Sequence, residues 1–130
     1  MKTIIFLFLS LVLNLPIIGS VLVPVDSSNA DVFNRLCQVH EAEFSVVTGK
    51  VPNIDGTFDV EYSWKAPFNA FLLVENKKPV GFVVKDTIEG ISDVTSFFII
   101  PSCRGRGLGK RMAYEIFDRF PGMWQVRQLA

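Results

Sequence analysis

The stretch 97-FFIIPSCRGRGLGKR-111 decides the fold of this chain. Its first four residues, 97–100, are aromatic or β-branched and predict a buried strand. Pro101 ends that strand, three glycines follow in a short loop, and an amphipathic helix begins near Leu108. Glycine amides with no Cβ in their way, at the positive end of a helix dipole, favour an anion. The stretch therefore predicts a strand, a glycine loop and a helix that together bind an anionic group.

The charge of the chain is balanced overall and basic only at this loop. Lys plus Arg and Asp plus Glu both number 13, which gives no global charge for a nucleic-acid partner. Four cations nevertheless gather around the glycines: Arg104, Arg106, Lys110 and Arg111. The loop is therefore expected to meet one anionic ligand and no nucleic acid.

Length and cysteine content limit the remaining possibilities. The chain has 130 residues, enough for one domain with a core of its own. Its two cysteines, Cys37 and Cys103, are far apart and lack the spacing of a metal site or a disulfide scaffold. We therefore expect no metal and a reducing compartment.

The first 20 residues read differently from the rest. Lys2 precedes an apolar run over residues 4–13, and Pro16 and the pair Gly19-Ser20 follow it. This is the layout of a secretory signal, and the run is too short for a transmembrane helix. An apolar strand or hairpin at the domain edge is the alternative. We divide the chain into an N-terminal segment, 1–20, and a domain, 21–130, and expect membrane contact only if the segment is retained.

Periodicity in the domain predicts alternating strands and helices. Apolar residues at helical spacing predict helices over 29–47 and from the glycine loop to Phe120, with Ser28 as the first N-cap and Gly49 as the first stop. Strands are predicted at 21–25, 69–75, 80–85, 91–100 and 123–129. Short turns make the middle three an antiparallel meander, and the helical crossover puts the last strand parallel to 91–100. The expected fold is α/β, a mixed, mainly antiparallel sheet with flanking helices in the order β-α-β-β-β-α-β.

Two features outside the glycine loop have both a structural and a functional interpretation. His40 is the single histidine and lies on the inward stripe of the first helix, where packing is more common than catalysis. Residues 49–68 are irregular and rich in aromatic side chains, which either line a cleft or pack beneath the loop.

The motif Ile99-x-Pro101-x-x-Arg104-Gly105-x-Gly107-x-Gly109 resembles the acetyl-CoA-binding motif, Q/R-x-x-G-x-G/A, of the GNAT superfamily of N-acetyltransferases. The predicted order of elements is similar to that fold as well. The tail Phe120-Pro121-Gly122-Met123-Trp124-Gln125-Val126 resembles a bacterial branch with a Phe-Pro-Gly-x-Trp-x-Val ending.

The resemblance implies a site and a reaction. Pantetheine would pair with the backbone of Ile99 and Ile100, and the pyrophosphate would lie on the amides that follow the arginine. The residues implied in cofactor binding are Ile99, Ile100, Arg104, Gly105, Arg106, Gly107, Leu108, Gly109 and Lys110. A primary amine, on a small molecule or a protein, would attack the thioester of acetyl-CoA while a general base takes its proton.

Three departures from the family pattern leave the catalytic residue unknown. Ser96 occupies a strand position that is often acidic in this branch, and strand alternation would turn nearby Asp93 to the opposite face. Cys103 replaces a residue that is commonly aromatic. The chain ends at Ala130, before the helix and two strands with which the family continues.

Three functions therefore stand as hypotheses. The first is a cytoplasmic acetyl-CoA-dependent N-acetyltransferase. The second is a truncated or degenerate domain that binds CoA without turnover. The third is an exported, non-enzymatic binding domain, which rests on residues 1–20 alone. The last strand, 123–129, would form an exposed apolar edge, so we also expect a homodimer through it.

Overall fold

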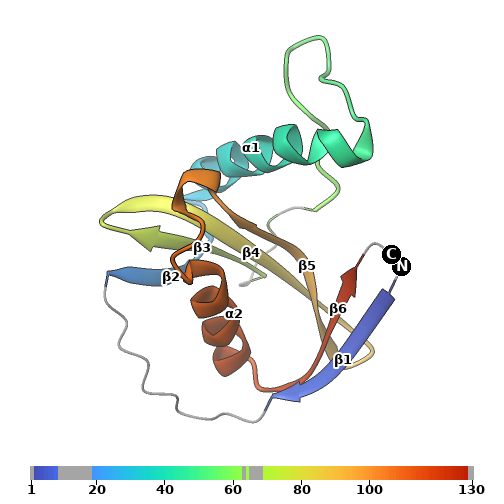
Figure 1. Cartoon of the computed structure of the whole chain (residues 1–130), viewed down its shortest axis with the longest axis vertical. Helices are drawn as coiled ribbons and strands as arrows, with labels where there is room; N and C mark the ends of the chain where they lie inside the picture. The colour runs from blue at the N-terminus through green and yellow to red at the C-terminus, as the bar shows by residue number, and fades with distance from the viewer. Residues whose placement is uncertain (1, 9–18, 63, 65–68, 129–130) are drawn as a thin grey trace.

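The computed structural model describes residues 2–8, 19–62, 64 and 69–128. Within them, six strands form one sheet in the order β1-β6-β5-β4-β3-β2 (Figure 1). The elements are β1 (Lys2–Phe8), β2 (Ser20–Pro24), α1 (Ala30–Thr48), β3 (Ala70–Glu75), β4 (Lys78–Ile88), β5 (Ile91–Ile99), the 3₁₀ turn η1 (Pro101–Cys103), α2 (Leu108–Arg119) and β6 (Gly122–Gln128). β5 and β6 run parallel and the other neighbouring strands antiparallel. The expected α/β fold is confirmed.

Two tight turns produce the meander of β3, β4 and β5. Asn76 and Lys77 join β3 to β4 with φ of 50° and 63°, and Glu89 and Gly90 join β4 to β5 with φ of 52° and 78°. Two consecutive residues with positive φ give the turn whose twist matches that of paired strands. The three strands are therefore positioned by local sequence.

The helices cover opposite faces of the sheet. On the α1 face, Phe33, Leu36 and Cys37 pack with Phe82 and Phe98 of the central strands. On the α2 face, the core consists of alternating strand residues and the apolar stripe of α2: Leu22, Phe71, Leu73, Val80, Val83, Ile99, Leu108, Met112, Ile116, Phe117 and Trp124. Along β3 the side chains alternate between the two faces: Phe71 and Leu73 pack on the α2 side and Leu72 on the α1 side.

An irregularity in β5 changes which of its side chains share a face. Ser96 pairs with Val84, but the next pair is Val94 with Lys85, so Thr95 is an extra residue. Beyond it, Asp93 lies opposite Asp86, on the same face as Ser96. The expectation that Asp93 and Ser96 face opposite ways was wrong, because strict alternation does not hold across a bulge.

Helix α1 begins and packs differently from the expectation. Asn29, and not Ser28, is its N-cap; the Asn29 Oδ1 accepts a hydrogen bond from the Asp26 N–H at 2.8 Å instead of capping the helix. Gly49 ends the helix as expected, in the left-handed region at φ 72°. Near this end Phe44 and Val47 are exposed.

The N-terminal segment supplies a strand. Lys2–Phe8 pairs antiparallel with β6 along its length, which is the alternative kept open for this segment, while residues 9–18 lie outside the described part. The last strand is therefore not the sheet edge, contrary to the expectation behind the homodimer, since β1 covers it (Figure 1). None of the helices described is both long and apolar enough to cross a membrane.

Candidate functional site

A groove opens where β5 and β6 part. Their parallel pairing extends from Ser92 with Trp124 to Val94 with Val126, and β5 then continues to Ile99 away from β6 (Figure 1). A groove of about 470 Å³ lies at this end of β5 and is lined by His40, Glu43, Phe97, Phe98, Ile99, Arg104, Gly105, Gly107, Leu108 and Gly109. It joins the strand, the glycine loop and the inner wall of α1.

The backbone of β5 offers hydrogen-bonding groups on the side left by β6. The Ile100 N–H donates to the Val80 carbonyl in β4 at 2.8 Å. Because backbone groups alternate along a strand, the N–H groups of Ile99 and Phe97 point away from β4. The Ile99 carbonyl accepts a hydrogen bond from Arg104 Nε at 2.9 Å. An extended ligand in the groove would therefore meet the amides of Phe97 and Ile99.

The glycine loop leads directly into the first turn of α2. Gly105 and Gly107 have φ of 80° and 78°, a region that other residues rarely adopt, and Gly107 is the N-cap of the helix. Gly109 lies in the first turn against β5, where an added Cβ would be 3.6 Å from Phe97 Cε1 and 3.8 Å from Ile99 Cγ1. The first amides of a helix have no partner within it. Such amides favour an anion, and here they lie beside the strand.

The four cations of the loop are held in different places. Arg104 forms an ion pair with Glu43 at 2.7 Å, and both side chains line the groove. Arg106 pairs with Glu75 at 2.7 Å, at the end of β3. Arg111 donates to Ser20 Oγ at 3.1 Å, and Lys110 lies 5.8 Å from the ring centroid of Tyr114. Arg104 is thus the cation of this group that lines the groove.

The predicted cofactor-binding residues divide accordingly. Six of them line the groove: Ile99, Arg104, Gly105, Gly107, Leu108 and Gly109. Ile100, Arg106 and Lys110 are not among the residues that line it, and their assignment stays a prediction. The groove is also lined by Phe97 and Phe98, which precede the motif and had no predicted role, and by His40 and Glu43 of α1. No spacing rule links α1 to the loop, so Glu43 had no signal in the sequence.

His40 lies in a ring of aromatic side chains at the groove wall. Its ring stacks on Phe44 at 5.7 Å between centroids with an interplanar angle of 11°. It also contacts Phe98 at 5.0 Å, Phe82 at 5.8 Å and Tyr62 at 6.1 Å. Burial lowers the pKa of His40 from its ordinary value of 6.5.

The two cysteines lie in different surroundings. Cys37 is buried on the inner side of α1, and burial raises the pKa of its thiol to about 12. Cys103 is partly exposed in η1, with its sulfur 3.9 Å from Ser102 Oγ. Among the residues described, no group of three or more His, Cys, Asp or Glu side chains could hold a metal ion.

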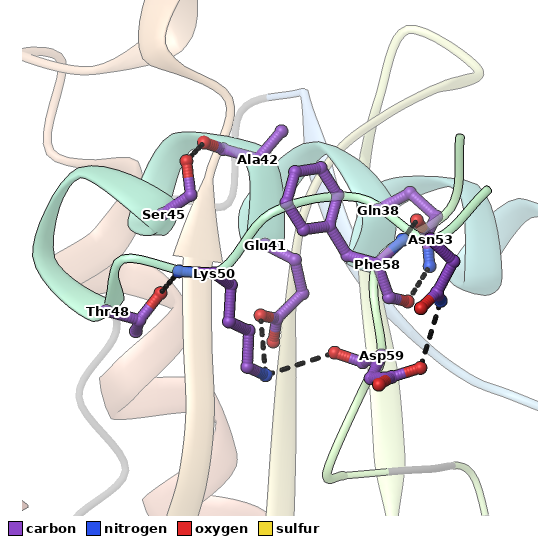
Figure 2. A network of polar contacts seen from close by, with 9 residues as sticks. All are labelled: Gln38, Glu41, Ala42, Ser45, Thr48, Lys50, Asn53, Phe58 and Asp59. Atoms are coloured by element: carbon purple, nitrogen blue, oxygen red, sulfur yellow. Dashed lines mark hydrogen bonds and ion pairs between the residues drawn. The ribbon is translucent and has the colours of Figure 1, made fainter. Parts of the chain in front are cut away.

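A polar network fixes the segment after α1 (Figure 2). Gln38 Nε2 donates to the Phe58 carbonyl at 3.0 Å, and Gln38 Oε1 accepts from the Phe58 N–H at 2.7 Å. Lys50 Nζ lies 3.3 Å from the buried Glu41 carboxylate and donates to the Asp59 carbonyl at 3.1 Å. The network leads the chain to Tyr62, beside His40.

Two aromatic residues of this segment pack beneath it. Tyr62 and Trp64, with Val60, lie against the core on the α1 face. The packing interpretation therefore applies to these residues, while Pro67 and Phe68 lie outside the described part of the chain.

The comparisons with known proteins identify the family. Residues 33–128 match the acetyltransferase (GNAT) family, so this chain belongs to it. A comparison with curated proteins finds no match.

Solved structures share the fold at low sequence identity. A GCN5-related N-acetyltransferase from Kribbella flavida is 16% identical, with a TM-score of 0.54 over 95% of this chain and 46% of that one. N-acetylglutamate synthase from Neisseria gonorrhoeae, complexed with coenzyme A and N-acetyl-glutamate, is 12% identical. Its TM-score is 0.53, and the match covers 77% of this chain and 22% of that one. Arabidopsis thaliana Naa50, in complex with the bisubstrate analogue CoA-Ac-MVNAL, is 14% identical. Its TM-score is 0.50, and the match covers 78% of this chain and 64% of that one. This chain thus spans less than two thirds of each of these proteins.

Proposed function

We propose that this protein binds acetyl-CoA in the groove and transfers its acetyl group to a primary amine. The observation that carries the proposal is the coincidence of three features at one place: strands that part, a glycine loop, and a helix N-terminus. The strand edge suits an amide-rich chain such as pantetheine, because the Phe97 and Ile99 amides point away from β4. The helix end and Arg104 suit a pyrophosphate.

The acceptor is an amine of unidentified type. Among the structural neighbours, one is named as an N-acetylglutamate synthase and another was solved with a peptide-bearing bisubstrate analogue. These titles motivate two probes for this chain, L-glutamate and the peptide Met-Val-Asn-Ala-Leu with a free N-terminus. A protein that uses acetyl-CoA would act in the cytoplasm, and an intact mass that retains residues 1–20 would support that location over export.

Calorimetry with acetyl-CoA tests the binding half of the proposal. The informative variant is Gly109→Ala, because the added methyl meets its neighbours at ordinary van der Waals distances yet protrudes where Gly109 lines the groove. We expect it to fold at least as stably as the wild type, since Ala is favoured over Gly in a helix by about 0.5–1 kcal/mol. We also expect it to weaken acetyl-CoA binding by about tenfold or more, equivalent to about 1.4 kcal/mol.

Gly49→Ala is the matched control. Gly49 also tolerates a Cβ sterically but lies at the end of α1, outside the groove residues. It should lose stability, because φ is 72°, and keep its affinity for acetyl-CoA. Absence of binding to the folded wild-type chain at millimolar acetyl-CoA would contradict the proposal. Binding without acetyl transfer would leave only the interpretation of a domain that binds CoA without turnover.

A further inference from the structure

His40 lies in α1, the helix that forms one wall of the groove. It is the single histidine of the chain, and it lines the groove together with the β5 residues Phe97 and Phe98 and the loop residue Arg104. A side chain at this place borders both the strand edge and the α1 face. It is therefore adjacent to the space through which an amine could approach a ligand lying along β5.

The imidazole is held in one orientation by packing. Phe44 stacks nearly parallel to it, Phe82 meets it edge-on at 86°, and Phe98 and Tyr62 contact it at tilted angles. These four aromatic neighbours restrict rotation of the ring. Within the described part of the chain, no hydrogen bond is formed by either ring nitrogen of His40. The ring is thus fixed and its nitrogens remain available.

The groups around His40 leave it uncharged near neutral pH. Burial lowers its pKa, the carboxylates of Glu41 and Glu43 raise it, and the guanidinium of Arg104 lowers it, with a net decrease from 6.5. Cys37 and Tyr62, the other titratable groups of this cluster, have pKa values raised by burial and stay neutral. A neutral imidazole can accept a proton, whereas the paired Arg104 cannot.

We infer that His40 is the proton acceptor for the attacking amine. This inference rests on the proposed function. The amine nitrogen forms a bond to the thioester carbonyl carbon, the carbon–sulfur bond breaks, and the nitrogen gives a proton to His40. When the acceptor arrives as a neutral amine, the imidazolium of His40 passes this proton to the departing CoA thiolate. When it arrives as an ammonium ion, it first releases one further proton to solvent.

The strand carboxylate Asp93 is less suited to this step. It shares the α1 face with Ser96, but it is 5% exposed and pairs in register with Gln125, within the part of β5 that β6 still covers. It does not line the groove, whereas His40 does. Asp93→Asn is therefore the natural comparison for a His40 variant.

The single histidine allows a direct test that needs no acceptor. Its imidazole protons give one set of resonances in an NMR spectrum, whose titration yields the pKa of His40 without assignment. Saturating acetyl-CoA should shift these resonances, because His40 lines the groove that the cofactor would occupy. If calorimetry detects binding while the His40 resonances stay unchanged, the inference is wrong and the binding proposal stands.

Kinetics with the two probe amines provide the second test, read as release of CoA thiol. In the wild type, kcat/KM should fall at low pH with the pKa that NMR gives for His40. His40→Gln should remove this low-pH decrease in kcat/KM and lower kcat by about 100-fold or more, a larger effect than any change in the acetyl-CoA Kd. Val39→Ala, at an exposed position on the same helix, is the control and should match the wild type.

The outcomes separate the two claims. If the decrease of kcat/KM at low pH persists in His40→Gln and disappears in Asp93→Asn, the assignment of His40 as the proton acceptor is wrong. Failure to bind acetyl-CoA at all would contradict the proposed function itself.

Discussion

His40 differs from the other groove side chains in carrying an imidazole, whose ordinary pKa of 6.5 is lowered here by burial. Its sequence position predicts only a residue on the inner stripe of a helix, because i, i+3 and i+4 spacing cannot tell a core position from a groove wall. What distinguishes it is tertiary: Tyr62 arrives from a loop and Phe98 from a distant strand. A lone histidine can therefore be found by sequence reasoning, but its role requires the folded neighbours.

Folding stability should depend on the protonation of His40. Its folded pKa lies below 6.5, so between these two values the unfolded chain binds more protons than the folded chain. The stabilising contribution is complete above 6.5 and is lost as the pH falls through the folded pKa. Urea unfolding of wild type and His40→Gln between about pH 7.5 and 5 should show a steeper loss in the wild type. Equal pH dependence in the two proteins would contradict this account.

The close approach of β4 and β5 depends on one glycine. A Cβ at Gly81 would lie 2.5 Å from the Phe98 carbonyl oxygen and 2.8 Å from Ile99 Cδ1. Gly81→Ala should therefore destabilise the protein by about 1–3 kcal/mol, the usual cost of overpacking a core. Urea unfolding measures the change, with Gly109→Ala as a glycine variant that has room for its methyl. A Gly81→Ala protein as stable as the wild type would show that the strands can separate freely.

At the scale of elements, α1 and the segment after it form one unit. Glu41 is 5% exposed and has Lys50 as its ion-pair partner (Figure 2). Lys50→Met should leave this carboxylate buried and uncompensated, at a cost of about 1–3 kcal/mol. Lys78→Met, at an exposed position of β4, is the control and should change the free energy of unfolding little. A Lys50→Met protein with wild-type stability in urea would show that the network does not hold the segment.

The elements themselves were largely predictable, and their exceptions have physical reasons. The meander and the glycine loop depend on turn residues and periodicity, which are local in sequence. The bulge at Thr95 depends on pairing with β4, so the local sequence of β5 does not predict it. It places Asp93 on the face opposite to the predicted one. Likewise the Arg104–Glu43 ion pair joins residues from separate elements, so no spacing rule could have included Glu43 in the site.

At the scale of the whole molecule, β1 changes the interpretation of the sheet. The prediction of an exposed last strand followed from treating residues 1–20 as separate from the domain. In the structure Lys2 through Phe8 pair with Gln128 through Gly122, so β6 has a neighbour on both sides. The same sequence pattern, an apolar run, suits a signal segment and a buried strand, and composition alone does not separate them.

Removal of β1 should expose the edge that it covers. A chain without residues 2–8 would present the backbone of β6, and unpaired strand edges associate. Sedimentation should therefore detect more self-association in the shortened protein than in the full chain at equal concentration. Identical sedimentation of the two proteins, both folded, would indicate that β1 does not protect this edge.

The central claim is that acetyl-CoA occupies the groove at the end of β5, lined by α1, the glycine loop and the start of α2. Amide hydrogen exchange with and without saturating acetyl-CoA tests it most directly. We predict slower exchange in the complex at Phe97, at Ile99 and at the first amides of α2, with the amides of β2 unchanged. Protection elsewhere in the chain, with none at these positions, would contradict the account.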